Sequence, residues 1–234
     1  MNPGSTRSPV VHPLDNAVHV ALSTHQAGVA ETHGTATRYP PDVNLFYGVE
    51  RCDETGWLDL AELAGRGAAV VLFRDEVPPP PDGWELLMSG PGYQMVLDDL
   101  APTAPTDIVR LDDSHAAAML DLATRTEPGP FFARTHELGR FAGVFDGDRL
   151  VAMAGERMHL PGYREISAVC TDESARGRGL AAALTAHVAR GILADGEQPL
   201  LHVAGGNDAA RRVYERLGFV TRRMVEFHAL RTPS

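Results

Sequence analysis

The chain has 234 residues, 44% of them hydrophobic, which is enough to bury a substantial core in one large or two small domains. Its net charge of −10 argues against a nucleic-acid-binding surface, and all 21 of its basic residues are arginine. The acidity lies in the first half, because residues 1–105 hold 5 Arg against 14 Asp and Glu, whereas residues 106–234 hold 16 against 17.

Cysteine content and apolar segments restrict the class of protein further. Two cysteines, Cys52 and Cys170, provide no disulfide framework. The N-terminus lacks an apolar signal region and no stretch approaches the length of a membrane span, so we expect a cytoplasmic protein without a membrane partner. No metal site is expected, because the spacing of the N-terminal histidines matches no ligand motif; these are His12, His19, His25 and His33.

The first half of the chain predicts a small α/β lobe without a catalytic motif. A loose arm is expected at 1–13, because it holds three prolines and shows no periodicity. The elements expected after it are helices at 14–37 and 58–65, a strand at 68–73, and two strands at 84–88 and 93–97 joined by a turn at 89–92.

A Pro- and Thr-rich segment at 101–106 predicts a hinge, which divides the chain into domains at 1–105 and 106–234. Beyond it the order of elements is regular. We expect first a strand at 107–111, a helix beginning at 112–114 and a short helix at 131–138. A hairpin of 140–145 with 150–158 follows, and a reversal at Pro161-Gly162 leads into a strand at 163–171. The last elements expected are a helix after Gly179, a strand at 199–204, a helix ending at Leu217 and a strand at 225–230.

The strand at 163–171 leads through a short polar loop into a glycine-rich turn, Arg-Gly-Arg-Gly-Leu-Ala at 176–181, which opens an apolar helix. The first N–H groups of such a helix are unpaired and lie at the positive end of its dipole. Gly177 and Gly179 allow a phosphate to approach the backbone, and Arg176 and Arg178 add positive charge. The turn therefore predicts a pyrophosphate site, although neither a P-loop nor a G-x-G-x-x-G pattern is present.

The pattern Arg176-x-x-Gly179-x-Ala181 after a strand resembles the GNAT superfamily of acetyl-CoA-dependent N-acyltransferases. A second block agrees with this resemblance, since Asn207 opens a helix that carries Tyr214 and ends in Leu-Gly-Phe. The resemblance covers residues 106–234. Residues 1–105 resemble, more faintly, the degenerate N-terminal lobe of relatives that include glycine N-acyltransferases, and the second half resembles the C-terminal domain of that branch.

This resemblance implies an α/β (α+β) fold with a mixed, mostly antiparallel central sheet flanked by helices, preceded by a smaller degenerate α/β lobe. It also implies acetyl-CoA as co-substrate, with its pantetheine arm bonded to the strand backbone as if it were an added strand. The residues implied to contact acetyl-CoA are Val169, Cys170, Thr171, Arg176, Gly177, Arg178, Gly179, Leu180, Ala181, Asn207 and Tyr214.

Three side chains are candidates for acid–base work. If the hairpin turns at Pro161-Gly162, Glu156 and Glu165 lie on the same sheet face as diagonal neighbours, roughly 7–8 Å apart at Cα. Two such carboxylates raise the pKa of at least one toward that of a general base. The alternative is a pair of edge carboxylates bound to arginines, or a base supplied by a water relay. Tyr214 lies two helical turns after Asn207, and the resemblance assigns it the role of acid toward the leaving thiolate.

The sequence thus predicts an N-acetyltransferase that transfers an acetyl group to a primary amine of a small molecule or peptide, by direct attack in a ternary complex. A longer acyl-CoA, an amino-acid acceptor, or a catalytically silent acyl-CoA-binding module stays open. No nucleic-acid partner is expected, and a homodimer is left open as the assembly.

Overall fold

The computed structural model describes residues 12–234, so the expected arm at 1–13 lies almost wholly outside the described residues. Five helices belong to this part of the chain: α1 (Ala17–Ser23), α2 (Glu54–Ala64), α3 (Ala116–Thr126), α4 (Leu180–Ala194) and α5 (Asp208–Arg216). Its strands are β1 (Glu31–His33), β2 (Ala36–Arg38), β3 (Phe46–Val49), β4 (Ala69–Arg74), β5 (Glu85–Leu97), β6 (Val109–Leu111), β7 (Phe141–Asp146), β8 (Arg149–Leu160), β9 (Tyr163–Thr171), β10 (Gln198–Ala204) and β11 (Phe219–Arg231).

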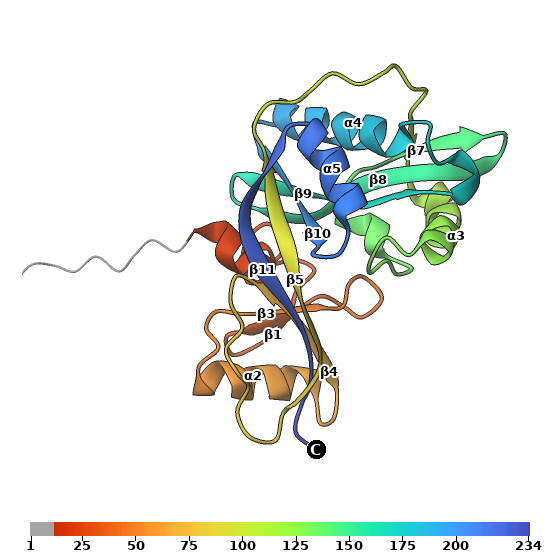
Figure 1. Cartoon of the computed structure of the whole chain (residues 1–234). Coiled ribbons are helices and arrows are strands. Elements are labelled where there is room, and N and C mark those ends of the chain that lie inside the picture. Colours follow the sequence, from red (N-terminus) through yellow and green to blue (C-terminus); the bar gives the residue numbers. More distant parts are fainter. Residues whose placement is uncertain (1–11) are drawn as a thin grey trace, which may run out of the picture.

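All of these strands join one sheet in the order β1-β2-β3-β4-β11-β5-β10-β9-β8-β7-β6 (Figure 1). Only the β3–β4 and β9–β10 pairs are parallel, and the other neighbours are antiparallel. The expected mixed, mostly antiparallel sheet flanked by helices is therefore confirmed. Residues 131–138 form a 3₁₀ turn at Thr135–Leu138 in place of the expected short α-helix.

Helices cover both faces of the sheet, and each face has its own core. On one face, the Ala- and Leu-rich helix α4 packs Leu184, Ala189 and Ile192 against Ile166 of β9 and Leu201 of β10. On the other face, α1 packs over β8 and β10 near Met158, Leu160 and Leu200, while α3 covers the β7–β9 end of the sheet. Among residues 12–234 no helix is both long enough and apolar enough to cross a membrane.

Strand β5 lies in the middle of the sheet, between β10 and β11. The expectation of two strands with a turn at 89–92 is wrong, because β5 runs unbroken through that segment and pairs with β11 along its length. Neither Gly90 nor Gly92 has the positive φ that a two-residue hairpin turn of type I′ or II′ requires. Pairing with β11 holds the glycines extended, which a local reading of turn residues does not detect.

The expected long helix at 14–37 is also wrong. Helix α1 has seven residues and ends at Ser23, and the chain then forms the β1–β2 hairpin. Gly34 has φ 54° at the turn of that hairpin, a backbone angle that glycine adopts without a Cβ clash. Strands β1 to β4 belong to the same sheet as the second half of the chain, and the division at residue 105 stays a prediction.

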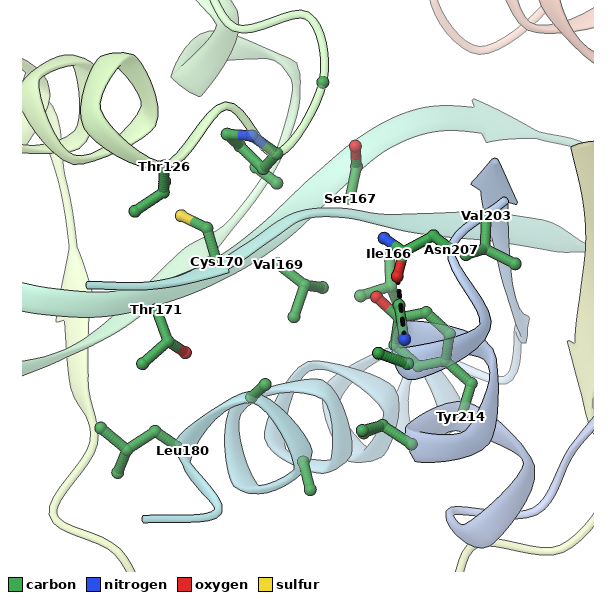
Figure 2. Close-up of a pocket in the computed structure, with 18 of the residues that line it drawn as sticks. Thr126, Ile166, Ser167, Val169, Cys170, Thr171, Leu180, Val203, Asn207 and Tyr214 are labelled. Atoms are coloured by element: carbon green, nitrogen blue, oxygen red, sulfur yellow. Dashed lines mark hydrogen bonds between the residues drawn. The ribbon is translucent and has the colours of Figure 1, made fainter. Parts of the chain in front are cut away.

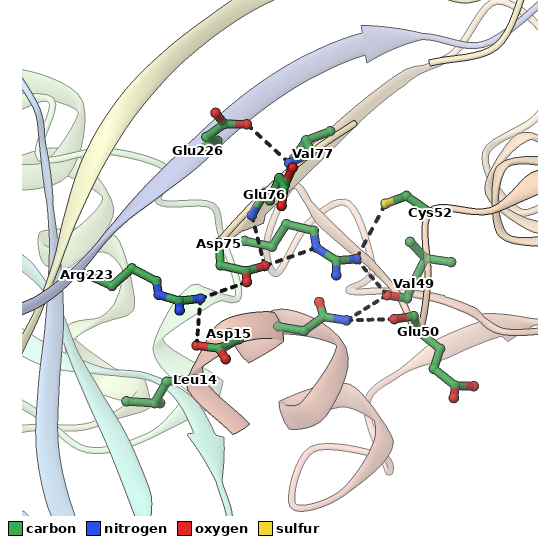
Figure 3. Close-up of polar contacts among 12 residues, drawn as sticks. Leu14, Asp15, Val49, Glu50, Cys52, Asp75, Glu76, Val77, Arg223 and Glu226 are labelled. Atoms are coloured by element: carbon green, nitrogen blue, oxygen red, sulfur yellow. Dashed lines mark hydrogen bonds and ion pairs between the residues drawn. The ribbon is translucent and has the colours of Figure 1, made fainter. Parts of the chain in front are cut away.

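An arginine bridges three segments that are far apart in the sequence (Figure 3). Arg223 of β11 lies 3.2 Å from a carboxylate oxygen of Asp15 and 2.8 Å from one of Asp75. Arg222 binds Asp15 as well, at 2.6 Å. The residues before α1 and the end of β4 are thus tied to the last strand of the chain.

Candidate active site

A cleft opens where β9 and β10 separate. The two strands pair in parallel only between Tyr163–Ile166 and Gln198–Leu201, although β9 continues to Thr171 and β10 to Ala204. The second half of β9 therefore has backbone N–H and C=O groups on the β10 side without a strand partner. The cleft has a volume of about 980 Å³, within the range of cofactor and substrate sites.

The backbone of β9 bulges where the cleft begins. Ala168 has φ 53°, and the register with β8 changes from Gly155↔Ser167 to Met153↔Cys170, so β9 carries one extra residue there. The bulge turns Cys170 toward the α3 core, whereas Ile166 packs against α4 on the other face of the sheet. Burial raises the pKa of the Cys170 thiol to about 11, so this side chain is protonated at neutral pH.

The glycine-rich turn forms one end of the cleft (Figure 2). Gly177 and Gly179 have φ 78° and 75°, and open space surrounds the position of a Cβ at each. Leu180 begins α4, so the first N–H groups of the helix have no intrahelical acceptor and lie at the positive end of the dipole. The backbone and charge at this end suit an anion such as a pyrophosphate.

Ten of the eleven residues implied to contact acetyl-CoA line the cleft: Val169, Cys170, Thr171, Arg176, Gly177, Gly179, Leu180, Ala181, Asn207 and Tyr214. Arg178 does not line it. The Arg178 side chain is half-exposed and lies 3.7 Å from Asp146 at the end of β7, so its charge acts on the cleft only from a distance.

Asn207 and Tyr214 close the cleft from the side of α5 (Figure 2). Asn207 is the N-cap of this helix, and its Oδ1 accepts a hydrogen bond of 3.0 Å from the Ala210 N–H. Tyr214 is 8% exposed, and burial raises the pKa of its phenol to about 12. The hydroxyl group is therefore protonated at neutral pH and can donate.

Glu165 lies outside the cleft lining and is 0% exposed. Arg157 donates two hydrogen bonds to it, of 2.7 and 2.6 Å, and His202 Nδ1 lies 2.7 Å from its Oε1. Burial alone would raise the pKa of Glu165, but the charge and hydrogen bonds of Arg157 and the hydrogen bond of His202 outweigh it and lower the pKa to about 2. The expected upward shift is wrong.

Glu156 lies on the opposite face of the sheet from Glu165. An extra residue in β8 changes the register from Glu156↔Ile166 to His159↔Arg164, so Glu156 shares the face of Ile166. It is 2% exposed and pairs with Arg140 at 2.6 Å and Arg164 at 3.3 Å. The shared face expected for the two carboxylates is wrong, and the alternative of carboxylates bound to arginines describes both side chains.

The sequence did not predict the hydrogen-bonded series of polar side chains beside the cleft, which runs from Arg157 and Glu165 through His202 and Gln94 to Arg222. Arg157 and His202 line the cleft. Because Glu165 accepts from His202 Nδ1, the Nε2 atom of His202 is the acceptor for the Gln94 amide, at 3.1 Å. The Oε1 of Gln94 accepts from Arg222 at 2.7 Å. The only signal in the sequence was the polar character of these residues within apolar strands.

One group of three potential metal ligands occurs among residues 12–234: His25, His159 and Glu197. Arg164 lies beside it, 2.8 Å from Glu197 and 3.3 Å from His159 Nε2. The Arg164 guanidinium is therefore the positively charged partner of the Glu197 carboxylate.

Comparison with known proteins agrees with this geometry. Residues 141–228 match the family model described as FR47-like protein. A crystal structure assigned to the GNAT acetyltransferase family, from Novosphingobium aromaticivorans, is 37% identical over 95% of this chain and 99% of that chain, with a TM-score of 0.86. No curated protein matches the chain at a significant level.

More distant structures share the fold. A GCN5-related N-acetyltransferase from Kribbella flavida is 19% identical over 93% of this chain and 96% of that chain, with a TM-score of 0.62. A GCN5-related N-acetyltransferase-like protein from Streptococcus suis is 16% identical over 91% of this chain and 92% of that chain, with a TM-score of 0.53. With the relative from N. aromaticivorans matched over nearly its whole length, the chain belongs to the GNAT superfamily of acyl-CoA-dependent N-acetyltransferases.

Proposed function

We propose that the protein transfers an acetyl group from acetyl-CoA to a primary amine of a small molecule or peptide, by direct attack in a ternary complex. The observation that carries the proposal is the convergence of three features in one cleft. These are the unpaired backbone edge of β9, the glycine turn at the start of α4, and a protonated Tyr214.

The cleft residues suit acetyl-CoA along its length. Backbone N–H groups at Gly177, Gly179 and Leu180 would hold the pyrophosphate, with Arg176 adding charge. The free backbone groups of β9 from Val169 to Thr171 would hydrogen-bond the amides of the pantetheine arm, as an added strand would. This arrangement brings the thioester toward the bulge at Ala168 and toward Tyr214.

Direct attack is supported by the state of the nearest thiol. Cys170 is the one cysteine that lines the cleft within residues 12–234. Its raised pKa, about 11, keeps it protonated at neutral pH, and a nucleophilic cysteine requires the thiolate. An acyl-enzyme formed on Cys170 is therefore disfavoured, and the amine itself is the nucleophile.

Tyr214 is the proposed acid. Its buried phenol keeps its proton at neutral pH and can donate to the sulfur as the bond between carbonyl carbon and sulfur breaks. Glu165 is proposed as a positioning residue, since both of its oxygens are bound to Arg157 and His202. Glu156, on the other face, is proposed to hold Arg140 and Arg164.

The proposal is tested by a screen of primary amines against acetyl-CoA, with release of free thiol as the readout. Amine-dependent release of thiol is expected from the wild type, and at a rate ~10²–10⁴-fold lower from Tyr214→Phe. Binding of acetyl-CoA without thiol release for any amine would instead identify a silent acyl-CoA-binding protein. Repeating the active pairs with propionyl- and butyryl-CoA measures the acyl length that the cleft accepts.

A further inference from the structure

Glu127 is the only carboxylate among the cleft-lining residues in the described part of the chain. It follows the last residue of α3 and stands with Thr126 and Gly129 on the cleft wall. Neither Glu156 nor Glu165 lines the cleft. The residue that could meet a positively charged acceptor is therefore one that no motif in the sequence marks.

The backbone of Glu127 is held in an uncommon conformation. Its φ and ψ are 47° and 56°, in the left-handed region, and its N–H closes α3 by bonding to the Ala123 carbonyl at 2.8 Å. Glycine adopts this conformation without strain and is common at such helix ends, whereas other L residues avoid it. The only other non-glycine residue with positive φ between residues 12 and 234 is Ala168, on the cleft wall as well. Strain of this kind gathers at functional sites.

The Glu127 carboxylate has no hydrogen bond or ion pair with any side chain of residues 12–234. Prolines at 128 and 130 restrict the loop that follows it. None of the three arginines that line the cleft pairs with Glu127: Arg157 is bound to Glu165, Arg176 lies at the glycine turn, and Arg216 ends α5. Glu127 is thus an exposed cleft-lining carboxylate without a counter-charge from any side chain of residues 12–234.

We propose that Glu127 is the acceptor-recognising residue, which binds the ammonium form of the substrate amine and orients it before attack. This inference rests on the proposed function and names its acceptor class: primary amines that are cationic at neutral pH. A charge-assisted bond orients the nitrogen toward the thioester carbonyl.

The proton and bond changes balance. The bound ammonium gives one proton to water in the open cleft, and the freed lone pair forms the bond between nitrogen and carbonyl carbon. The bond between that carbon and sulfur breaks, and sulfur takes the Tyr214 proton. The amide nitrogen loses its surplus proton to water, and Tyr214 regains one from solvent.

Comparing a cationic acceptor with a neutral one distinguishes recognition of the ammonium by Glu127 from a purely structural role. A panel of alkylamines, such as n-butylamine, is protonated at neutral pH, whereas the alkoxyamine of equal length, here O-propylhydroxylamine, is a neutral primary amine. For Glu127→Gln we expect kcat/KM to fall roughly tenfold to a hundredfold with alkylamines, the scale of a lost hydrogen bond to a charged group. With alkoxyamines the loss should be several-fold smaller, and the affinity for acetyl-CoA unchanged.

Three further variants complete the experiment. Glu127→Asp keeps the carboxylate at a residue that tolerates the left-handed region, and should retain part of the alkylamine activity. Glu127→Gly removes the backbone strain at this position, so the melting temperature of the variant should rise while its alkylamine activity falls. Asp148→Asn, an exposed acid in the β7–β8 turn outside the cleft, removes the same charge and should match the wild type.

Each outcome decides something. Equal loss with both acceptor classes, or a Glu127→Gly variant that is stabilised and fully active, would show a residue that only caps α3 and overturn the inference. If Glu127→Gln and Asp148→Asn both behave as the wild type, the acceptor role is likewise wrong while the proposed function stands. If the wild type releases thiol with no amine of either class, the proposed function fails, and this inference with it.

Discussion

At the scale of single residues, burial keeps the phenol of Tyr214 protonated, whereas Arg157 and His202 keep the carboxylate of Glu165 ionised. For Tyr214→Phe we expect turnover to fall by ~10²–10⁴-fold, the usual contribution of a positioned acid. The ring still packs against Phe219, so the acetyl-CoA dissociation constant should stay unchanged. Steady-state kinetics and calorimetry measure the two effects, with Tyr93→Phe on β5 as the control outside the cleft. Normal turnover would remove Tyr214 from the mechanism.

Glu165 gives a prediction on stability. Its folded pKa of about 2 lies below its ordinary value of 4.5, so its stabilisation is fully present above about pH 4.5 and is lost as the pH falls toward 2. The shift corresponds to about 3 kcal/mol. Glu165→Gln should lower the free energy of unfolding by roughly 3–5 kcal/mol at neutral pH, because Arg157 loses its counter-charge.

Urea unfolding as a function of pH tests this. The difference between wild type and Glu165→Gln should shrink as the pH falls from about 4.5 toward 2. A cycle with Arg157→Gln and the double variant isolates the pair, and the double variant should be less destabilised than the sum of the single ones. Additive losses would show that the two side chains act independently.

At the scale of elements, the turn before α4 gives a matched comparison of two glycines. Gly179 and Gly162 have φ 75° and 77°, and both have open space where a Cβ would stand. Alanine should therefore destabilise the protein at either position by a similar amount, about 1 kcal/mol. Only Gly179→Ala should weaken acetyl-CoA binding, because only that Cβ would stand in the path of the pyrophosphate.

Calorimetry with acetyl-CoA, together with thermal unfolding, separates the two effects. We expect a loss of affinity of at least tenfold for Gly179→Ala and none for Gly162→Ala, which lies in the β8–β9 turn outside the cleft. Equal affinities in the two variants would place the pyrophosphate elsewhere.

At the scale of the whole molecule, one sheet carries one such cleft among residues 12–234. We therefore expect one acetyl-CoA to bind per chain, measured by calorimetry on active protein. A stoichiometry of two would show a second acetyl-CoA site and contradict this prediction.

The placement of β5 leads to a second prediction at this scale. A fragment of residues 106–234 lacks β5, and with it the strand that lies between β10 and β11. Both neighbours would then expose unpaired edges, so the fragment should aggregate or stay unfolded by circular dichroism and gel filtration. Cooperative unfolding of the fragment would instead support a domain boundary near residue 105.

The sequence by itself determined the features that depend on short contiguous segments. The glycine-rich turn at 176–181, the start of α4, and the spacing of Asn207 and Tyr214 on α5 each follow from residues within a few turns of one another. Ten of the eleven residues that the family resemblance implies to contact acetyl-CoA line the cleft, and their contacts with the co-substrate stay a prediction.

The tertiary structure alone decided which polar groups face that cleft. A single extra residue at each bulge, in β8 near Arg157 and in β9 at Ala168, moves the following side chains to the other face of the sheet. Glu156 and Glu165 were separated in this way, and both were bound to arginines. Glu127 reached the cleft because α3 packs against β8 and β9. Pairing register and helix packing join residues far apart in the chain, and no local pattern encodes them.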